Sequence, residues 1–412
     1  MIRVNNIHLS LDYDDKSVRK AVAQQLRIEE KSIKSCKIFR RSVDARKKDS
    51  IYFLTTVDAE LNINEDKVCK KCGNAQIARK YEYNQMKFGN APSPIVVGAG
   101  PAGLFAALIL ARSGANPILI ERGRDVDRRT ADVNRFWTSG QLDTTSNVQF
   151  GEGGAGTFSD GKLNTLVKDK FGRNHEVLRI FAEHGAPESI TYESKPHIGT
   201  DVLSAVVKEM RKYICAHGGE VRFHSQVTDI QTHSDNGQKI LRKLKIYDSQ
   251  KKEIYLLDTD LAVFAIGHSA RDTFSMLYQH GLPMQPKAFA VGVRIEHPQE
   301  MINQDQYGKN YPSFLPAAPY KLTANLDNGR GVYTFCMCPG GTVTGAASEP
   351  GGVVTNGMSS WARDGRNSNA AVLVGVTPDD FQEEGPLAGV AFQRKLEQAA
   401  FRLAGGNYNA PA

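Results

Sequence analysis

"IVVGAGPAGLFAALILARSGANPILIERG", residues 95–123, is the stretch of sequence that decides the fold. A strand-like apolar run leads into G-x-G-x-x-G at Gly98, Gly100 and Gly103, and a helix-like segment and a second strand-like run follow. The first glycine of such a motif permits a tight turn, the second lets the backbone approach a pyrophosphate, and the third lets the helix pack on the strand. The stretch therefore predicts a Rossmann-like dinucleotide-binding unit, with the phosphates at the helix N-terminus.

Glu121 ends the second strand-like run, 23 residues after Gly98. A carboxylate at this place accepts hydrogen bonds from ribose hydroxyls, and it repels a 2′-phosphate, which disfavours NADP. The competing interpretation is a structural glycine turn with an unrelated Glu. The order of strand, motif, helix and strand argues against it.

Residues 94–111 carry no charge, over a length close to that of a membrane helix. The glycines and Pro101 interrupt this run where a strand should turn into a helix, so we interpret it as a buried strand, turn and helix. The N-terminus shows no apolar run behind a basic start, and a secretory signal is therefore not supported. The sequence favours a cytoplasmic protein that does not bind a membrane, with its six cysteines reduced.

The rest of the chain suggests four segments. Residues 1–90 predict a small basic α/β module of βαββ order, ferredoxin-like in type, with a linker at 87–94. Residues 91–280 alternate strand-like and helix-like stretches, which predicts a doubly wound, Rossmann-like sheet. Residues 281–360 hold short β-like runs with Gly and Pro between them and predict an inserted, mostly β substrate domain, after which residues 361–412 return, incompletely, toward the first sheet.

The net charge of +7 comes from residues 1–90, because the Lys and Arg of the remaining chain are balanced by Asp and Glu. The densest basic patch is "RRSVDARKK", residues 40–48, which lacks the interleaved aromatics of a single-strand binding platform. An acidic partner, either RNA or protein, could use this excess. A solvated surface with scattered Lys and Arg is the simpler interpretation.

"NVQFGEGGAGTFSDGKLNT", residues 147–165, is rich in glycine and small polar residues. Such a run lets backbone N–H groups converge on an anion or on the edge of a cofactor. A flexible surface loop is the alternative interpretation. Its place after the first βαβ unit favours cofactor contact.

Three features resemble FAD-binding members of the glutathione reductase superfamily. Pro101 within the motif and the closing "ERG" resemble their fingerprint, and "AVFAIGHSARD", residues 262–272, resembles their second glycine signature. "EVRFHSQVTDI" resembles the strand whose Val, here Val227, packs against the adenine. The sequence contains no second strand-linked G-x-G-x-x-G, which favours the branch with a single FAD domain.

Six ordered motifs resemble a family of bacterial FAD-dependent dehydrogenases that have no assigned substrate: "FGEGGAGTFSDGKL", "KPHIGTD", "AIGHSARDTF", "VGVRIEHPQ", "YTFCMCPGG" and "VTNGMS". The resemblance implies FAD binding and redox activity. Members continue past the equivalent of residues 403–412 into a Gly-rich helix that touches the flavin, so this chain is expected to be truncated at its C-terminus. The predicted cofactor contacts are Gly98, Gly100, Pro101, Ala102, Gly103, Glu121, Arg122, Gly153, Gly154, Ala155, Gly156, Thr157, Ser159, Val227 and Gly267.

Lys162 and Arg294 are candidate catalytic residues, because a cation near the flavin would stabilise the reduced anion. Cys336 and Cys338, in "YTFCMCPGG", are candidates for thiol redox chemistry with the flavin, and two thiols that only pack on one face of a strand are the alternative interpretation. On an extended strand both would face one side about 6.6 Å apart, too far for a disulfide unless the strand kinks at Met337. No metal site is expected, since zinc binding by the "CKKC" run would need two further ligands.

The sequence therefore predicts an FAD-dependent oxidoreductase that acts on a small molecule or a small electron carrier. A second hypothesis is a flavoprotein whose basic N-terminal module recruits RNA or an acidic protein. A third is a nucleotide-binding scaffold without catalysis.

Overall fold

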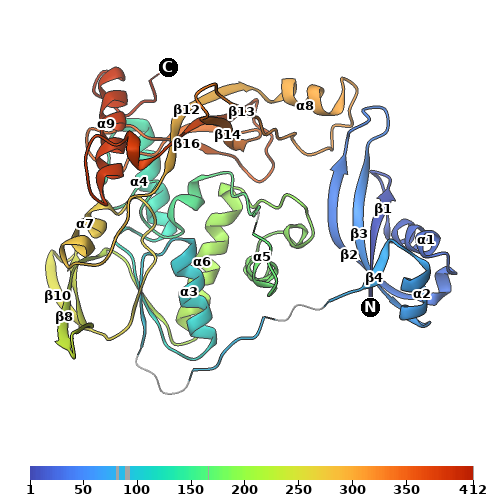
Figure 1. Ribbon diagram of the computed structural model, residues 1–412, viewed down its shortest axis with the longest axis horizontal. Helices are drawn as coiled ribbons and strands as arrows, with labels where there is room; N and C mark the ends of the chain where they lie inside the picture. The colour runs from blue at the N-terminus through green and yellow to red at the C-terminus, as the bar shows by residue number, and fades with distance from the viewer. Residues whose placement is uncertain (80–82, 89–92, 166, 412) are drawn as a thin grey trace. The chain divides into compact units, whose positions relative to one another are not determined.

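The computed structural model describes residues 1–79, 83–88, 93–165 and 167–411 (Figure 1). The chain divides into two compact units. The first contains residues 1–84, 162–198 and 298–318, and the second contains residues 85–161, 199–297 and 319–412. Part of the linker predicted at 87–94 lies outside the described residues. The predicted domain boundaries stay predictions.

The N-terminal part of the first unit is a four-stranded antiparallel sheet with strand order β2-β3-β1-β4. Ile2 and Val4 of the first strand and Val18 and Val22 of the first helix share its core. The segments predicted as strand, helix, strand and strand correspond to β1, α1, β2 and β3. The elements in chain order are β1 Ile2–Leu9, α1 Asp15–Leu26, β2 Ile33–Asp44, β3 Tyr52–Leu61, α2 Glu65–Lys71 and β4 Ala75–Ile77.

The sequence did not predict β4, and of α2 it indicated only that Cys69 and Cys72 lie on a helix; Cys69 lies in α2 and Cys72 caps it. The seven residues of α2 are mostly charged and bury only Val68, so no apolar periodicity marks this helix. A side-chain cap starts it instead, because Asn64 Oδ1 accepts from the N–H of Lys67 at 3.0 Å. The β-α-β-β-α-β order that results is the order of ferredoxin-like modules.

Part of the basic patch of residues 40–48 is used inside the first unit. Arg41 forms an ion pair with Glu193 and lies 4.8 Å from the ring centroid of Phe53. Arg40 Nε donates to Ser194 Oγ at 2.9 Å. These contacts involve the segment that carries α5 Arg173–Glu183, and the unit also contains α8 Gln299–Tyr307.

The second unit is built on a parallel sheet with strand order β11-β5-β6-β7. The helices α3 and α6 contact each other and these strands, so they cover one face of the sheet. In Figure 1 the two helices run side by side. The bounds are β5 Ile95–Val97, α3 Pro101–Arg112, β6 Ile118–Ile120, α4 Val126–Ser139, α6 Thr200–Ala216, β7 Glu220–Arg222, β11 Ala262–Phe264 and α7 Arg271–Gln279.

The other face of the parallel sheet is covered by an antiparallel sheet. The expectation of a doubly wound sheet, with helices on both faces, was therefore wrong. Ile95 and Ile120 pack in one core with Val227 and Leu244 of an antiparallel sheet, β8 Ser225–Asp235, β9 Gln238–Asp248 and β10 Glu253–Asp258. The stretch read as one strand, "EVRFHSQVTDI", is therefore two. The chain turns at His224, which has φ 55°, and passes from one sheet to the other.

A further sheet has strand order β12-β17-β14-β13, in which β14 is antiparallel to both β13 and β17, and β15 and β16 form a separate antiparallel pair. Its last long strand lies beyond residue 360, where the sequence analysis ended the β domain. The bounds are β12 Phe289–Pro298, β13 Thr323–Asn325, β14 Gly331–Cys338, β15 Thr342–Gly345, β16 Thr355–Met358, β17 Asn367–Val376 and α9 Ala388–Leu403. Across the described residues, no helix has the length and apolar character to cross a membrane.

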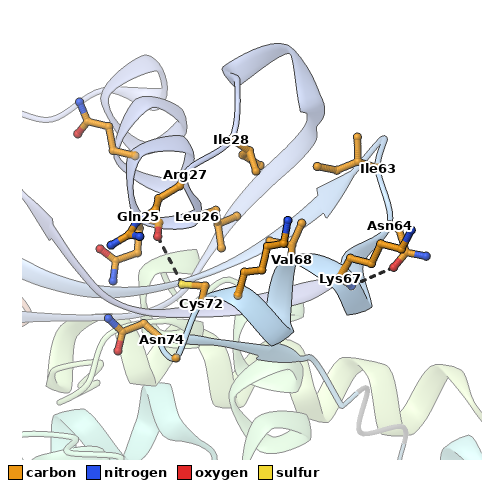
Figure 2. A pocket seen from close by; sticks show the side chains of 13 residues that line it. Gln25, Leu26, Arg27, Ile28, Ile63, Asn64, Lys67, Val68, Cys72 and Asn74 are labelled. Carbon is orange, nitrogen blue, oxygen red and sulfur yellow. Dashed lines mark hydrogen bonds between the residues drawn. The ribbon is translucent and has the colours of Figure 1, made fainter.

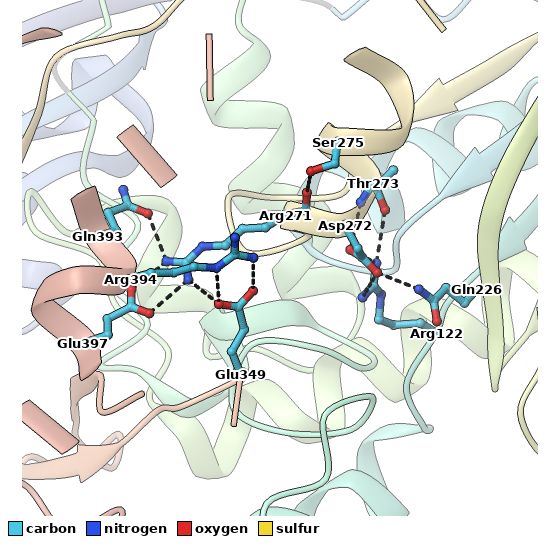
Figure 3. A network of polar contacts seen from close by, with 10 residues as sticks. All are labelled: Arg122, Gln226, Arg271, Asp272, Thr273, Ser275, Glu349, Gln393, Arg394 and Glu397. Carbon is cyan, nitrogen blue, oxygen red and sulfur yellow. Dashed lines mark hydrogen bonds and ion pairs between the residues drawn. The ribbon is translucent and has the colours of Figure 1, made fainter. Parts of the chain in front are cut away.

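An ion network ties α7 to α9 (Figure 3). Arg271, the first residue of α7, binds Glu397 of α9 at 2.6 Å and Glu349 at 2.8 Å. Arg394 binds the same Glu349 at 2.7 Å. Hydrogen bonds from Arg394 and Arg271 lower the pKa of Glu349 to about 2.

We expect Glu349 to make folding sensitive to acid. Its folded pKa lies below its ordinary value of 4.5, so its contribution is present above pH 4.5 and is lost as the pH falls toward 2. Glu349→Gln should lower the free energy of unfolding by about 1 kcal/mol at pH 6, after allowing for solvent screening, and by much less at pH 3. Urea unfolding at both pH values measures this, with exposed Glu253→Gln as the control. An equal loss at both pH values would contradict the expectation.

Candidate dinucleotide site

Two of the three fingerprint glycines, Gly98 and Gly103, are required by close backbone contacts. Gly98 has φ 100°, and a Cβ there would lie 2.6 Å from the carbonyl oxygen of Ala265. A Cβ on Gly103 would overlap the carbonyl oxygen of Gly98. Gly100 caps α3, whose first residue is Pro101. The turn thus delivers the positive end of a helix to the carboxyl edge of the parallel sheet, where an anion is favoured.

Glu121 is only 5% exposed and accepts hydrogen bonds from three separate segments. Its Oε2 accepts from the N–H of Ala99 at 2.7 Å, within the fingerprint. Its Oε1 accepts from Gly123 at 2.9 Å and from Gly151 of the glycine-rich loop at 3.0 Å. A carboxylate offers about four acceptor positions, so Oε2 keeps capacity for a ribose hydroxyl. The sequence predicted that contact and did not predict the three backbone bonds.

The glycine-rich loop lies against the fingerprint turn, as the position of residues 153–156 shows. The N–H of Gly153 donates to the carbonyl of Ala99 at 2.8 Å. A Cβ on Gly154 would lie 3.0 Å from Cα of Gly100, and one on Gly156 would lie 3.7 Å from Pro101. Two segments that the sequence separately predicted to contact a cofactor are therefore neighbours. The loop residues Ala155, Thr157 and Ser159 follow in the short 3-10 turn Gly154–Phe158 and just after it.

Arg129 of α4 holds the glycine-rich loop in place by hydrogen bonds. The sequence analysis did not identify this residue. Its side chain is fully buried and donates to three loop carbonyls, those of Asn147 at 2.9 Å, Val148 at 2.9 Å and Glu152 at 2.6 Å. Gly151 has φ 115°, and a Cβ there would overlap the Arg129 side chain. Burial lowers the pKa of Arg129 to about 10, so the guanidinium remains charged at neutral pH. Nothing in "DRRTAD" distinguishes Arg129 from its exposed neighbour Arg128.

A pocket opens beside the fingerprint, at the carboxyl ends of β5, β6 and β11. Gly98, Glu121, Arg122 and Val227, four of the predicted cofactor residues, line it together with Ile266. Gly267 is the next residue along the chain. Crevices of this kind are where α/β sheets bind nucleotides.

Asp272 and Phe150 fix the position of Arg122 at this pocket. Figure 3 shows the Arg122 guanidinium paired with the Asp272 carboxylate, at 2.9 and 3.0 Å. The guanidinium also lies 4.4 Å from the ring centroid of Phe150. A charged group held on two sides is pre-organised for contact with a ligand in the pocket.

Arg294, Cys336 and Cys338 form a second cluster in the same unit. Arg294 of β12 donates to Asn369 Oδ1 and, at 3.3 Å, to the carbonyl of Cys336. Among the described residues, no carboxylate pairs with Arg294, and the buried Nδ2 of Asn369 has no hydrogen-bond partner. The sequence analysis did not identify Asn369, because nothing in the polar start of β17, "NSN", distinguishes it from the two residues before it.

The cysteines correct the expected strand geometry. The register of β14 against β17 shifts between Phe335 and Cys338, and Cys336 has φ 44°, so the kink falls at Cys336 and not at Met337. Both cysteines are thiols. Cys338 is fully buried and its Sγ donates to the carbonyl of Cys336 at 3.2 Å.

Lys162 lies in the first unit, where a short antiparallel bridge pairs it with His197. The catalytic assignments of Lys162, Arg294 and the two cysteines stay predictions. Within the described ranges no group of three or more His, Cys, Asp or Glu could hold a metal.

We expect Glu121→Gln to destabilise the fold. An amide keeps one acceptor oxygen, so at least one of the three buried N–H groups would face an NH2 group and lose its partner. The cost should be about 1 to 3 kcal/mol in the free energy of unfolding, measured by urea denaturation without added cofactor. Glu253→Gln, at an exposed position, serves as the control. A loss no larger than the control's would show that the three hydrogen bonds are not important for stability.

Three family models match the chain. One described as an FAD binding domain matches residues 93–134, which include the fingerprint and Glu121. One described as FAD-dependent protein, C-terminal domain-like, matches residues 288–412. A domain of unknown function matches residues 1–60.

Solved structures that match part of the chain include THI4 from Thermovibrio ammonificans, at 19% identity and a TM-score of 0.32 over 47% of this chain and 64% of that one. Another is the glycerol-3-phosphate dehydrogenase from Bacillus halodurans complexed with FAD, at 11% identity and a TM-score of 0.34 over 75% of this chain and 54% of that one. An uncharacterized protein from Clostridium beijerinckii is 48% identical over 418 residues, which span 100% of this chain and 76% of the relative. The chain belongs to the same family as this clostridial protein, a family of FAD-dependent proteins.

Proposed function

We propose that this flavoprotein is an FAD-dependent oxidoreductase whose FAD lies along the fingerprint edge of the parallel sheet. The adenosine occupies the pocket lined by Glu121, Arg122 and Val227. The pyrophosphate meets the N-terminus of α3 and the glycine-rich loop. The observation that supports this most directly is the convergence of separately predicted cofactor segments on one pocket.

FAD supplies hydride and electron transfer when bound, and the protein supplies position, charge and exclusion of water. In this proposal Glu121 Oε2 accepts from a ribose hydroxyl while its other bonds hold the loop in place. Arg294 provides positive charge that no described carboxylate neutralises, which favours a reduced, anionic flavin. The substrate is a small molecule or a small electron carrier, as in the reading of the sequence.

Gly100→Ala tests the placement of the pyrophosphate. A Cβ on Gly100 would approach no described protein atom closer than Cα of Gly154 at 3.9 Å, so the fold should tolerate it. The same methyl group would fill space that the pyrophosphate needs. We expect at least a tenfold loss of FAD affinity, measured by calorimetric titration of the apoprotein, with an unchanged melting temperature.

Gly375→Ala is the matched control, because a Cβ at Gly375 meets nothing within 4 Å. It should change neither affinity nor melting temperature. ADP should compete with FAD for the wild-type protein, and FMN should not, because only ADP carries the adenosine. Unchanged FAD affinity in Gly100→Ala would refute this placement.

Arg294→Gln tests the role of the second cluster in redox chemistry. If the guanidinium stabilises the reduced flavin, its removal should lower the midpoint potential of bound FAD by about 30 mV or more, which is about 1.4 kcal/mol for a two-electron couple. Spectroscopic redox titration measures this, with the exposed Lys287→Gln as control. Equal midpoint potentials in the two variants would show that Arg294 does not act on the bound flavin. A protein that binds FAD but cannot be photoreduced would favour the scaffold hypothesis.

A further inference from the structure

A pocket in the N-terminal module lies between the C-terminal end of α1 and the helix α2 (Figure 2). Its lining includes three cations, Arg27, Lys67 and Lys71, and no acidic residue. All lining residues belong to the first unit. The pocket therefore has a definite charge, independent of anything in the dinucleotide site.

The three cations are not neutralised within the described part of the chain. No described carboxylate forms an ion pair with the side chains of Arg27, Lys67 or Lys71, although acidic residues lie close in sequence. Glu65 instead binds the N-terminal ammonium of Met1, and Glu29 binds Lys31 at 2.5 Å. Asp66 is exposed on α2 and does not line the pocket. Unpaired cations around a concave surface raise the local concentration of an anionic partner.

The pocket lining contains an aliphatic group, Leu26, Ile63 and Val68, which we call the floor of the pocket. Leu26 and Val68 are buried, and Ile63 is 42% exposed. Figure 2 labels these three side chains and Lys67 among the residues that line the pocket. An apolar floor with a cationic rim suits a partner that has an apolar side chain flanked by carboxylates.

We propose that this pocket binds an acidic segment of a partner protein. An aliphatic or aromatic side chain of the segment rests on Leu26, Ile63 and Val68, and its carboxylates meet Lys67, Lys71 and Arg27. No aromatic residue lines the pocket, so nucleic acid bases would find no stacking surface there. The basic stretch at residues 40–48 fits such a partner less well, because Arg41 already forms an ion pair with Glu193.

The test uses the full chain and a fluorescein-labelled dodecapeptide of Glu residues around a central Leu-Phe pair, followed by fluorescence anisotropy at 50 mM salt. Lys67→Glu/Lys71→Glu reverses two exposed charges four residues apart on α2. Lys16→Glu/Lys20→Glu makes the same change, with the same spacing, on exposed positions of α1 outside the pocket. We expect the first variant to lose at least about tenfold in affinity and the second less than about twofold. Equal losses would show non-specific attraction and overturn the proposal.

Three further measurements address misfolding, the apolar contact and the nucleic acid alternative. Lys67→Gln/Lys71→Gln removes the charges without adding repulsion on α2, and should still lose affinity with an unchanged melting temperature. Ile63→Ser should weaken the Leu-Phe peptide about threefold or more and leave an all-Glu peptide unaffected. Unchanged Leu-Phe binding in Ile63→Ser, or tighter pocket-dependent binding of oligouridylate than of the peptide, would overturn the proposal. None of these outcomes depends on FAD or on redox activity.

Discussion

The buried carboxylate of Glu121 makes the interactions on which the candidate dinucleotide site depends. It accepts N–H groups from the fingerprint, from its own strand end and from the glycine-rich loop. Glycine-rich backbone has few side chains with which to hold itself, and it loses much conformational entropy when it becomes ordered. One charged group that bonds three such segments offsets part of this cost. It also fixes their spacing relative to the parallel sheet.

Arg129 also holds the glycine-rich loop, but it donates hydrogen bonds where Glu121 accepts them. The carboxylate of Glu121 accepts a hydrogen bond from a backbone N–H of the loop, and the guanidinium of Arg129 donates to three of its carbonyls. Charge-assisted hydrogen bonds are roughly twice as strong as neutral ones, which suits a loop that must keep one conformation. Gly151 is the point where both meet, because its N–H binds Glu121 and its Cα packs on Arg129.

Sequence reasoning was most successful where local chemistry determines geometry. The fingerprint glycines and Glu121 could be found because their spacing is imposed by a turn, a helix start and a strand end. Sequence reasoning failed where contacts between residues distant in sequence determine the local geometry. His224 breaks an apparently continuous strand because two sheets meet there, and a kink at Cys336 interrupts the strand that we had expected to be extended through both cysteines. Arg129 looks like any surface arginine until the loop it holds is folded over it.

Two adjacent residues of α7, Arg271 and Asp272, form ion pairs with two different parts of the chain. Asp272 holds Arg122 at the pocket, across 150 residues of sequence, and Arg271 binds Glu397 of α9, across 126. During synthesis the complete fingerprint leaves the ribosome long before either partner does. The nascent chain therefore exposes the fingerprint turn while the pocket beside it still lacks Ala270 and Thr273, so the order of synthesis completes this pocket only when the start of α7 has emerged.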